Sequence, residues 1–317
     1  MAIRRNRFVA CVAALGLSTI FGIGLAAPPV SAAGSATSTL HFYSVTQGLT
    51  ATSATGQPVG PTALFSVGDH FDGTDLLYAG TNQRHAARFS GSDHLACVVT
   101  VASTVAERQT CSEQFAFGSA MLLATNVTVT FNGRTGTIPI NGGTGRYKNA
   151  RGTLVSTPIA DSNNFDNTFS LTGIGGGPTS VPLRAGTSLP FYTVQQTLRF
   201  TSAAGKPLPN IDATTVGDTY DSTDLYYAGT KKHHASNFSA SDHLACTFAA
   251  GDTQTCNDQI AIGGSLLLLN HVLEPSSGGT TVSAPINGGT GIYQNAAGRW
   301  ESGVNSVISN VTITLMG

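Results

Sequence analysis

Segments that alternate hydrophobic and polar residues recur along the chain and predict a fold built almost entirely from β-strands. Residues 41–47 (HFYSVTQ) place Phe42 and Ser44 on one face and Tyr43 on the other, and residues 190–196 (PFYTVQQ) repeat the pattern. A period of two residues is typical of a strand with one buried face. Further strand-like runs are DLLYAG, DLYYAG, LACVVTV, AMLLATNVTVTF, SLLLLNHVL and NVTITL. No segment after the N-terminal leader shows helical periodicity, so we expect an all-β protein.

The chain contains two copies of one sequence unit. Residues 67–97 are about two-thirds identical to residues 216–246, and residues 138–152 (IPINGGTGRYKNARG) return as residues 284–298 (APINGGTGIYQNAAG). A repeating unit this long is a whole domain rather than a turn of a solenoid. We therefore expect two copies of one fold.

Composition divides the chain into four parts. Residues 1–32 are predicted to be a signal peptide, with a basic start, an apolar run and small residues at a cleavage-like site. An uncleaved membrane anchor is the alternative, because the apolar run could span a bilayer. Residues 38–173 and 189–317 are the predicted domains, joined by a Gly- and Pro-rich linker at 174–188. We expect a secreted protein that does not associate with a membrane once the leader is cleaved.

Two Asn-Gly dipeptides predict tight turns at equivalent places in the copies. Asn141-Gly142 and Asn287-Gly288 are favoured in type I′ hairpin turns, which need positive φ at both central residues. The glycines that follow lack the Lys-Ser/Thr of a phosphate-binding loop, which argues against a nucleotide site. Six to eight short strands between such turns predict a closed barrel or a sandwich.

The charge pattern argues against nucleic-acid binding. The chain has 16 Lys and Arg residues and 17 Asp and Glu residues, and three of the arginines lie in the leader. The remaining chain therefore has a net charge near −4 and no basic stripe, whereas phosphate neutralisation needs clustered Lys and Arg.

Each copy carries two cysteines in the same context, DHLAC followed by QTC. In an exported protein such pairs predict disulfides, here Cys97 with Cys111 and Cys246 with Cys256. A two-cysteine metal site would need further ligands at fixed spacing, and none is evident. We expect neither a metal nor a cofactor.

The repeated GGTG-x-Y-x-N-A-x-G string resembles the hallmark of plant dirigent proteins, which also occurs in allene oxide cyclases. The strand around LACVV is similar to the corresponding strand of the cyclases. The resemblance spans most of each copy and implies tandem eight-stranded antiparallel β-barrels, each with a largely apolar lumen. It also implies proteins that hold a flexible apolar substrate in one conformation, either for radical coupling or for ring closure. Plant members are trimers, so homo-oligomerisation is a further expectation.

Two aspartates are candidates for acid catalysis. Asp75 and Asp224 stand at the start of a strand, where alternation could turn them into the lumen and burial would raise their pKa. The resemblance adds Arg151, which occupies the arginine of the dirigent A-R-G step and is replaced by Ala297 in the second copy. The opening strands offer glutamines such as Gln47 where the resembled families have an acidic residue.

Aromatic and histidine side chains are candidates for ligand binding. His94 and His243 could contact a ligand or move a proton, or they could make local hydrogen bonds together with the preceding aspartates. The tyrosines expected to line the lumens are Tyr43, Tyr78, Tyr192 and Tyr227.

Three functions remain open at this point. The first is a secreted protein that binds a small lipid or aromatic molecule in the barrel lumen. The second is an enzyme or steering protein for cyclisation or coupling, and the third is a structural or adhesive protein with filled barrels. A void above roughly 300 Å³ would favour a ligand. A carboxylate facing that void would favour the enzyme.

Overall fold

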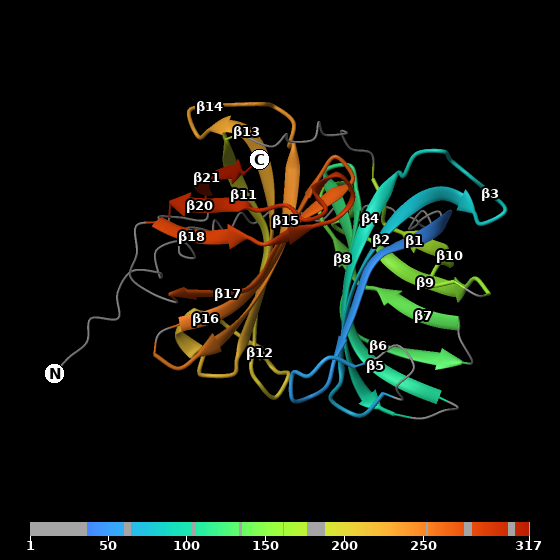
Figure 1. The fold of residues 1–317 in the computed structure, drawn as a ribbon. Helices are drawn as coiled ribbons and strands as arrows, with labels where there is room; N and C mark the ends of the chain where they lie inside the picture. The colour runs from blue at the N-terminus through green and yellow to red at the C-terminus, as the bar shows by residue number, and fades with distance from the viewer. Residues whose placement is uncertain are drawn as a thin grey trace, which may run out of the picture.

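The chain folds into two nearly closed antiparallel β-barrels that lie side by side (Figure 1). The computed structural model describes residues 37–59, 65–102, 106–132, 135–160, 162–175, 188–251, 253–275, 281–303 and 308–316. The predicted signal peptide and most of the predicted linker lie outside these residues. Within them, no helix is long and apolar enough to cross a membrane. The predicted all-β fold class is confirmed.

The first barrel is closed by pairing its first strand with both its last and its second. Its ring order is β1-β10-β9-β7-β6-β5-β4-β2, and β2 pairs back to β1. Two-residue strands β3 and β8 attach to β2 and β6. The bounds are β1 Ser38–Thr52, β2 His70–Thr81, β3 Arg84–His85, β4 Gly91–Val101, β5 Ala106–Phe117, β6 Ala120–Asn132, β7 Thr135–Ile140, β8 Gly142–Gly143, β9 Arg151–Pro158 and β10 Phe165–Thr172.

The second barrel repeats this order from β18 through β20, β21, β11, β13, β15 and β16 to β17. The eight antiparallel strands predicted for each copy are therefore confirmed, and the second barrel is nearly closed, with no ladder described between its end strands β17 and β18. The bounds are β11 Ser188–Thr201, β12 Pro207–Leu208, β13 Thr219–Thr230, β14 His233–His234, β15 Ala240–Ala249, β16 Thr253–Ile262, β17 Ser265–Pro275, β18 Thr281–Ile286, β19 Gly288–Gly289, β20 Gly298–Gly303 and β21 Ile308–Leu315. Single 3-10 turns are η1 Gly145–Tyr147, η2 Ile211–Ala213 and η3 Gly291–Tyr293.

Both lumens are filled by their own side chains, but with different residues. Three phenylalanines of the first lumen have isoleucine counterparts in the second, and two leucines have larger aromatic counterparts. The equivalent pairs are Phe115 and Ile260, Phe117 and Ile262, Phe169 and Ile313, Leu77 and Tyr226, and Leu154 and Trp300. The losses and gains of volume offset each other, as close packing of an interior requires.

The Asn-Gly dipeptides do not form the predicted type I′ hairpins. Gly142 begins the short strand β8, which pairs with β6, and positive φ occurs instead at Gly145 and, in the second copy, at Gly291. The Asn141 side chain accepts a hydrogen bond from Thr125 N and donates one to Thr125 O, which holds the chain against β6. These side-chain bonds keep the segment extended, so the bend comes three residues later than predicted.

Both predicted disulfides are present. Cys97 is bonded to Cys111 across β4 and β5, and Cys246 to Cys256 across β15 and β16. The two members of each pair are directly opposite in the antiparallel register. Each disulfide therefore joins neighbouring strands and restricts the unfolded chain.

Replacing both cysteines of one disulfide with alanine is expected to lower the free energy of unfolding by about 3 kcal/mol. The loss should be slightly smaller for Cys246 and Cys256, because they are 10 residues apart in sequence and Cys97 and Cys111 are 14 apart. Urea unfolding of the two double variants measures both values. Losses well below about 1 kcal/mol would contradict a stabilising role.

The two barrels are joined by an apolar seam built from equivalent positions of the copies. The buried side chains that form it come from β5, β6 and the β16–β17 hairpin: Ala116, Met121, Leu123, Ala261, Leu266 and Leu268. Each of these residues in the first copy has its counterpart among the three from the second. The seam is therefore self-complementary, like the contact between the subunits of a twofold-symmetric dimer.

Hydrogen bonds across the seam also occur in matched pairs. The Ser92 hydroxyl bonds with that of Thr290, and the equivalent Ser241 hydroxyl lies 2.6 Å from that of Thr144. The Ser92 hydroxyl also donates to Gly264 O in the β16–β17 turn at 3.0 Å, and the Ser241 hydroxyl donates to Ser119 O in the β5–β6 turn at 2.6 Å. The buried hydroxyl groups of these serines and threonines therefore all have hydrogen-bond partners across the seam.

The GGTG strings lie in this seam. Gln47 accepts a hydrogen bond from Gly291 N at 3.0 Å, and Gln196 accepts one from Gly145 N at 3.2 Å. A Cβ at Gly145 would lie 2.6 Å from the ring of Phe238 in the second barrel. Only glycine permits both this approach and the positive φ. The GGTG motif of each copy therefore contacts the other barrel and helps to hold the two barrels together.

Candidate functional site

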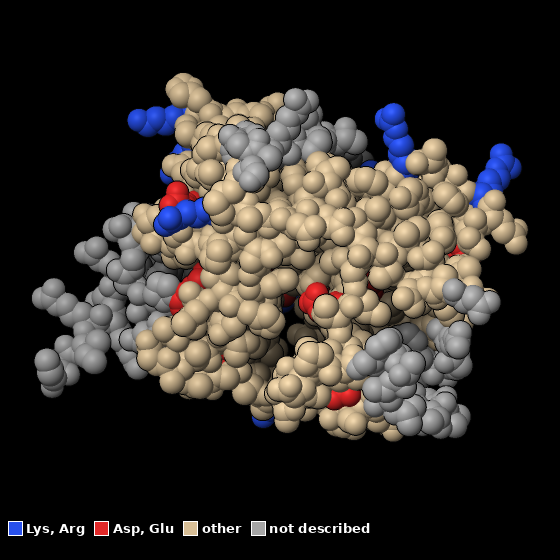
Figure 2. All heavy atoms as spheres, in the orientation of Figure 1, with Lys and Arg blue, Asp and Glu red and all other residues tan. Residues whose placement is uncertain are grey.

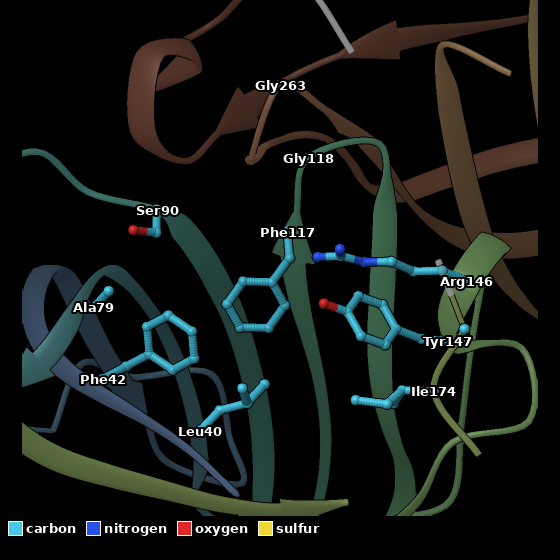
Figure 3. Close-up of a pocket in the computed structure, with 11 residues that line it drawn as sticks. Leu40, Phe42, Ala79, Ser90, Phe117, Gly118, Arg146, Tyr147, Ile174 and Gly263 are labelled. Atoms are coloured by element: carbon cyan, nitrogen blue, oxygen red, sulfur yellow. The ribbon is translucent and has the colours of Figure 1, made fainter. Parts of the chain in front are cut away.

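A partly open pocket of about 520 Å³ lies at one end of the first barrel (Figure 3). Its lining residues come from β1, β2, the residue before β4, the end of β5 and the turn after it, η1 and the segment after β10, with one glycine from the second barrel. They are Leu40, Phe42, Ala79, Ser90, Phe117, Gly118, Arg146, Tyr147, Ile174, Gly175 and Gly263. Most of these side chains are apolar.

The backbone at the end of β5 turns an aromatic side chain toward the pocket, where it meets two other rings. Phe117 ends β5 on its inward face, and Gly118 with φ of 69° makes the sharp turn into β6. The Phe117 ring lies 4.9 Å from that of Phe42 at 31°, and 6.0 Å from that of Tyr147. Rings in such an arrangement offer faces on which a flat apolar molecule can stack.

Arg146 carries the only charge among the lining residues. Its guanidinium carbon lies 4.6 Å from the centroid of the Tyr147 ring, and its backbone carbonyl accepts a hydrogen bond from Gly175 N at 2.8 Å. Figure 3 shows the guanidinium reaching from η1 toward Phe117. Burial raises the pKa of Tyr147, while the nearby Arg146 charge opposes that shift. The described ion pairs do not involve Arg146.

The second barrel has different residues at the equivalent end. Ile262 replaces Phe117, and Ile292 replaces Arg146 and is 51% exposed. Tyr293 is retained and buried. The second mouth therefore lacks the cation and the ring of Phe117, while Phe191 and Tyr293 stand where the first barrel has Phe42 and Tyr147.

A cluster of carboxyl groups lies inside the first lumen, away from the pocket lining. Asp75 accepts a hydrogen bond from the buried Ser44 hydroxyl at 2.5 Å, and Asp75 N donates one to Asp93 Oδ1 at 3.0 Å. Burial raises the pKa of Asp75. Burial, and then the charge of Asp75, raises the pKa of Glu113 to about 8. Glu113 Oε2 is buried without a hydrogen-bond partner. Glu113 therefore retains its proton near neutral pH.

The second lumen contains a related cluster. Asp224 N donates to Asp242 Oδ1 at 2.7 Å, and the Tyr226 hydroxyl donates to Asp242 Oδ2 at 2.7 Å. Burial, and then the charge of Asp242, raises the pKa of Asp224 to about 8. Asp258 completes the group, and its pKa is raised well above its usual range, chiefly by burial. Asp75 and Asp224 thus occupy the expected environment, and their catalytic role stays a prediction.

The four tyrosines do not line the lumens as expected. Tyr43 and Tyr78 pair across β1 and β2 on the outer face, and both rings lie beside His85, at 4.8 and 5.5 Å. Tyr192 and Tyr227 form the same arrangement with His234. Their inward neighbours on β1 and β11, the buried Phe42 and Phe191, occupy the lumens. Because strand side chains alternate, the tyrosines must point outward.

The two candidate histidines are also outside the lumens. His94 and His243 lie on the opposite face of their strands from the luminal aspartates, and both are buried. His94 Nε2 lies 3.1 Å from Asp72 Oδ2, and His243 Nε2 lies 2.6 Å from Asp221 Oδ2. Burial alone would lower the pKa of His243, but the charge of Asp221 and hydrogen bonding to it outweigh burial and raise it. Both histidines therefore make local hydrogen bonds, which is the alternative to ligand binding given by the sequence.

Arg151 is exposed at the start of β9, and its guanidinium donates to the adjacent Ala150 carbonyl oxygen at 2.7 Å. It therefore does not face the luminal carboxyl groups, contrary to the expectation that it would polarise a bound substrate. The part of the chain that the structure describes contains no group of three or more His, Cys, Asp or Glu residues placed to hold a metal ion.

Sequence reasoning missed Phe117, Tyr147 and Arg146. A signal was present, because Arg146 and Phe117 are positions where the otherwise similar copies differ in size or charge. Differences between duplicated domains point to places where one copy has a property that the other lacks.

No protein-family model matches the sequence, and no curated protein matches it. Among solved structures, a chain described as pyocyanin demethylase aligns at 19% identity with a TM-score of 0.32, covering 43% of this chain and 100% of that one. That similarity is too low to assign an activity here. The barrel architecture implied by the motif resemblance is confirmed, whereas membership of the dirigent or allene oxide cyclase families stays a prediction.

Proposed function

We propose that this protein is exported and binds a small, largely apolar molecule at the mouth of its first barrel. The observation that carries the proposal is the pocket of about 520 Å³ between Phe42, Phe117 and Tyr147. Its volume falls in the range of ordinary small-molecule sites, roughly 300–1,000 Å³, and its walls have the usual apolar and aromatic composition. The disulfides suit an oxidising compartment.

The position of the carboxyl groups supports binding over cyclisation. Asp75 and Glu113 lie within the packed lumen and are not among the residues that line the pocket. General acid catalysis requires the acid to lie within hydrogen-bond reach of the reacting atom. A molecule held at the mouth would be positioned by the aromatic walls.

The surface charge supports a small molecule over a nucleic acid as the partner. On the face shown in Figure 2, Lys and Arg side chains are isolated from one another and do not form a continuous patch. Binding to a phosphate backbone depends on clustered cations.

Ala79→Trp is expected to block the pocket, because Ala79 lines it and an indole would occupy the space beside Phe42. We expect wild-type protein to bind the uncharged dye Nile red, with a blue shift in its emission, and Ala79→Trp to weaken binding by about tenfold or more. Fluorescence titration measures both affinities.

The matched control is Ala228→Trp, at the equivalent exposed position of the second barrel. This variant should bind the dye within about twofold of wild type. Equal losses in the two variants would contradict the assignment to the first barrel. Wild-type protein that binds no apolar probe would favour a structural protein with filled barrels.

A further inference from the structure

We infer that the ligand of the first barrel is a planar apolar molecule with one anionic group, such as an aromatic carboxylate, and that Arg146 binds that group. This inference rests on the proposed function and adds the chemical class of the ligand. It follows from a half-buried cation, placed at an aromatic pocket that has no carboxylate among its lining residues.

Arg146 is available to a ligand. The described ion pairs of the chain do not include it, and the guanidinium lies over the ring of Tyr147, which shields one of its faces from water. A planar guanidinium can still offer N–H groups along its edge, and two of them match the two oxygens of a carboxylate. The Ser90 hydroxyl is another polar group at the pocket.

Comparison of the copies shows that the arginine is not needed for the fold. The second barrel has the same 3-10 turn and the same buried tyrosine, Tyr293, yet carries Ile292 where the first has Arg146. The tyrosine is therefore packed without a cation above it. One ring of the aromatic wall changes together with the charge, because Ile262 stands where the first barrel has Phe117. The Arg146 cation and the Phe117 ring occur together in the first barrel and are both absent from the second.

The contact with the second barrel helps to shape the site. Gly263, in the turn between β16 and β17, forms part of the pocket wall. Gly145, next to Arg146, is held from the second barrel by Gln196 and Phe238. The guanidinium is thus presented from a turn that the barrel pairing fixes, which reduces the entropy lost when an anion binds.

The test uses two probes of the same shape, 2-naphthoate and 2-naphthalenemethanol, in calorimetric titrations of the full chain at pH 7 and low salt. Wild-type protein should bind the carboxylate about five- to tenfold more tightly than the alcohol, as expected for a partly screened charge-assisted contact. Arg146→Ile, which introduces the residue of the second copy, should abolish this preference and leave binding of the alcohol within about twofold. Arg146→Lys should retain part of the preference, because it keeps the charge without the planar fork.

The control is Lys148→Ala, which removes an exposed cation close to the pocket without changing its lining. Its preference for the carboxylate should equal that of wild type. If the alcohol and the carboxylate bind wild-type protein equally and Ala79→Trp weakens both, the anionic ligand is refuted and the proposed function stands. If neither probe nor Nile red binds, both proposals fall. An equal loss of preference in Lys148→Ala would also refute a specific role for Arg146.

Discussion

Stability is expected to fall steadily as the pH rises from about 5 to 8, because the barrel interiors hold carboxyl groups that keep their protons. Burial raises the pKa of Glu113 and of Asp224 to about 8. It also raises the pKa of Asp93 and of Asp258 well above the usual range of an aspartate. In the unfolded chain these groups lose their protons near pH 4. No Lys or Arg is among the buried side chains that the structure describes.

The free energy of unfolding falls with rising pH because the folded form binds more protons than the unfolded form. Below pH 4 the folded and unfolded forms are both protonated at these positions, so the full stability is present. Between pH 4 and 8 the folded form binds more protons, and the free energy of unfolding falls by about 1.4 kcal/mol per pH unit for each retained proton. The raised pKa of His243 acts in the same direction. Above pH 8, Glu113 and Asp224 should contribute no further decline, because both are then ionised in the folded form as well.

Urea unfolding at half-unit steps from pH 5 to 9 measures this slope. Glu113→Gln keeps the shape of the side chain but removes one titrating group, so its slope should be shallower than that of wild type by up to about 1.4 kcal/mol per pH unit. Asp258→Asn is the equivalent variant in the second barrel. A free energy of unfolding that stays level or rises between pH 5 and 8 would show that these carboxyl groups are not protonated in the folded protein.

Leu266→Asp is expected to destabilise the protein by about 4 kcal/mol, because it places a charge without a partner in the seam between the barrels. Leu266 is fully buried there. Met121→Asp, at the equivalent position of the first barrel, should have a similar effect. Urea unfolding gives the loss, and hydrogen exchange at the β5–β6 and β16–β17 turns should increase in both variants.

Leu273→Asp is the matched control, because Leu273 lies on the same strand, β17, and is 67% exposed. We expect a change of no more than about 0.5 kcal/mol there. If Leu266→Asp unfolds at the same urea concentration as this control, the barrels do not stabilise each other through the seam.

The sequence predicts the barrels well because their signals are local. Alternation around Phe42, the duplicated units and the paired cysteines each reflect contacts between neighbouring strands or repeated segments. The same alternation contains the correction for Tyr43, since a strand with Phe42 inside must turn Tyr43 outward. The inward aspartates Asp75 and Asp224 were predictable for the same reason.

The seam and the pocket were not predictable, because both depend on contacts between distant segments. Nothing near Gln47 in the sequence indicates that its side chain binds Gly291 N in the other copy. The role of Gly145 likewise depends on Phe238, which comes from the second copy. A pattern along one strand reports which face is buried, but not which surface covers it.

Covalent joining of the barrels has a consequence for how they can evolve. Two separate identical subunits, encoded by one gene, would carry every substitution on both sides of the molecule. In a single chain, Arg146 and Ile292 can differ at equivalent positions while the shared contacts keep the halves together. The linkage also keeps the local concentration of each half high around the other, so the pair stays assembled however far the protein is diluted.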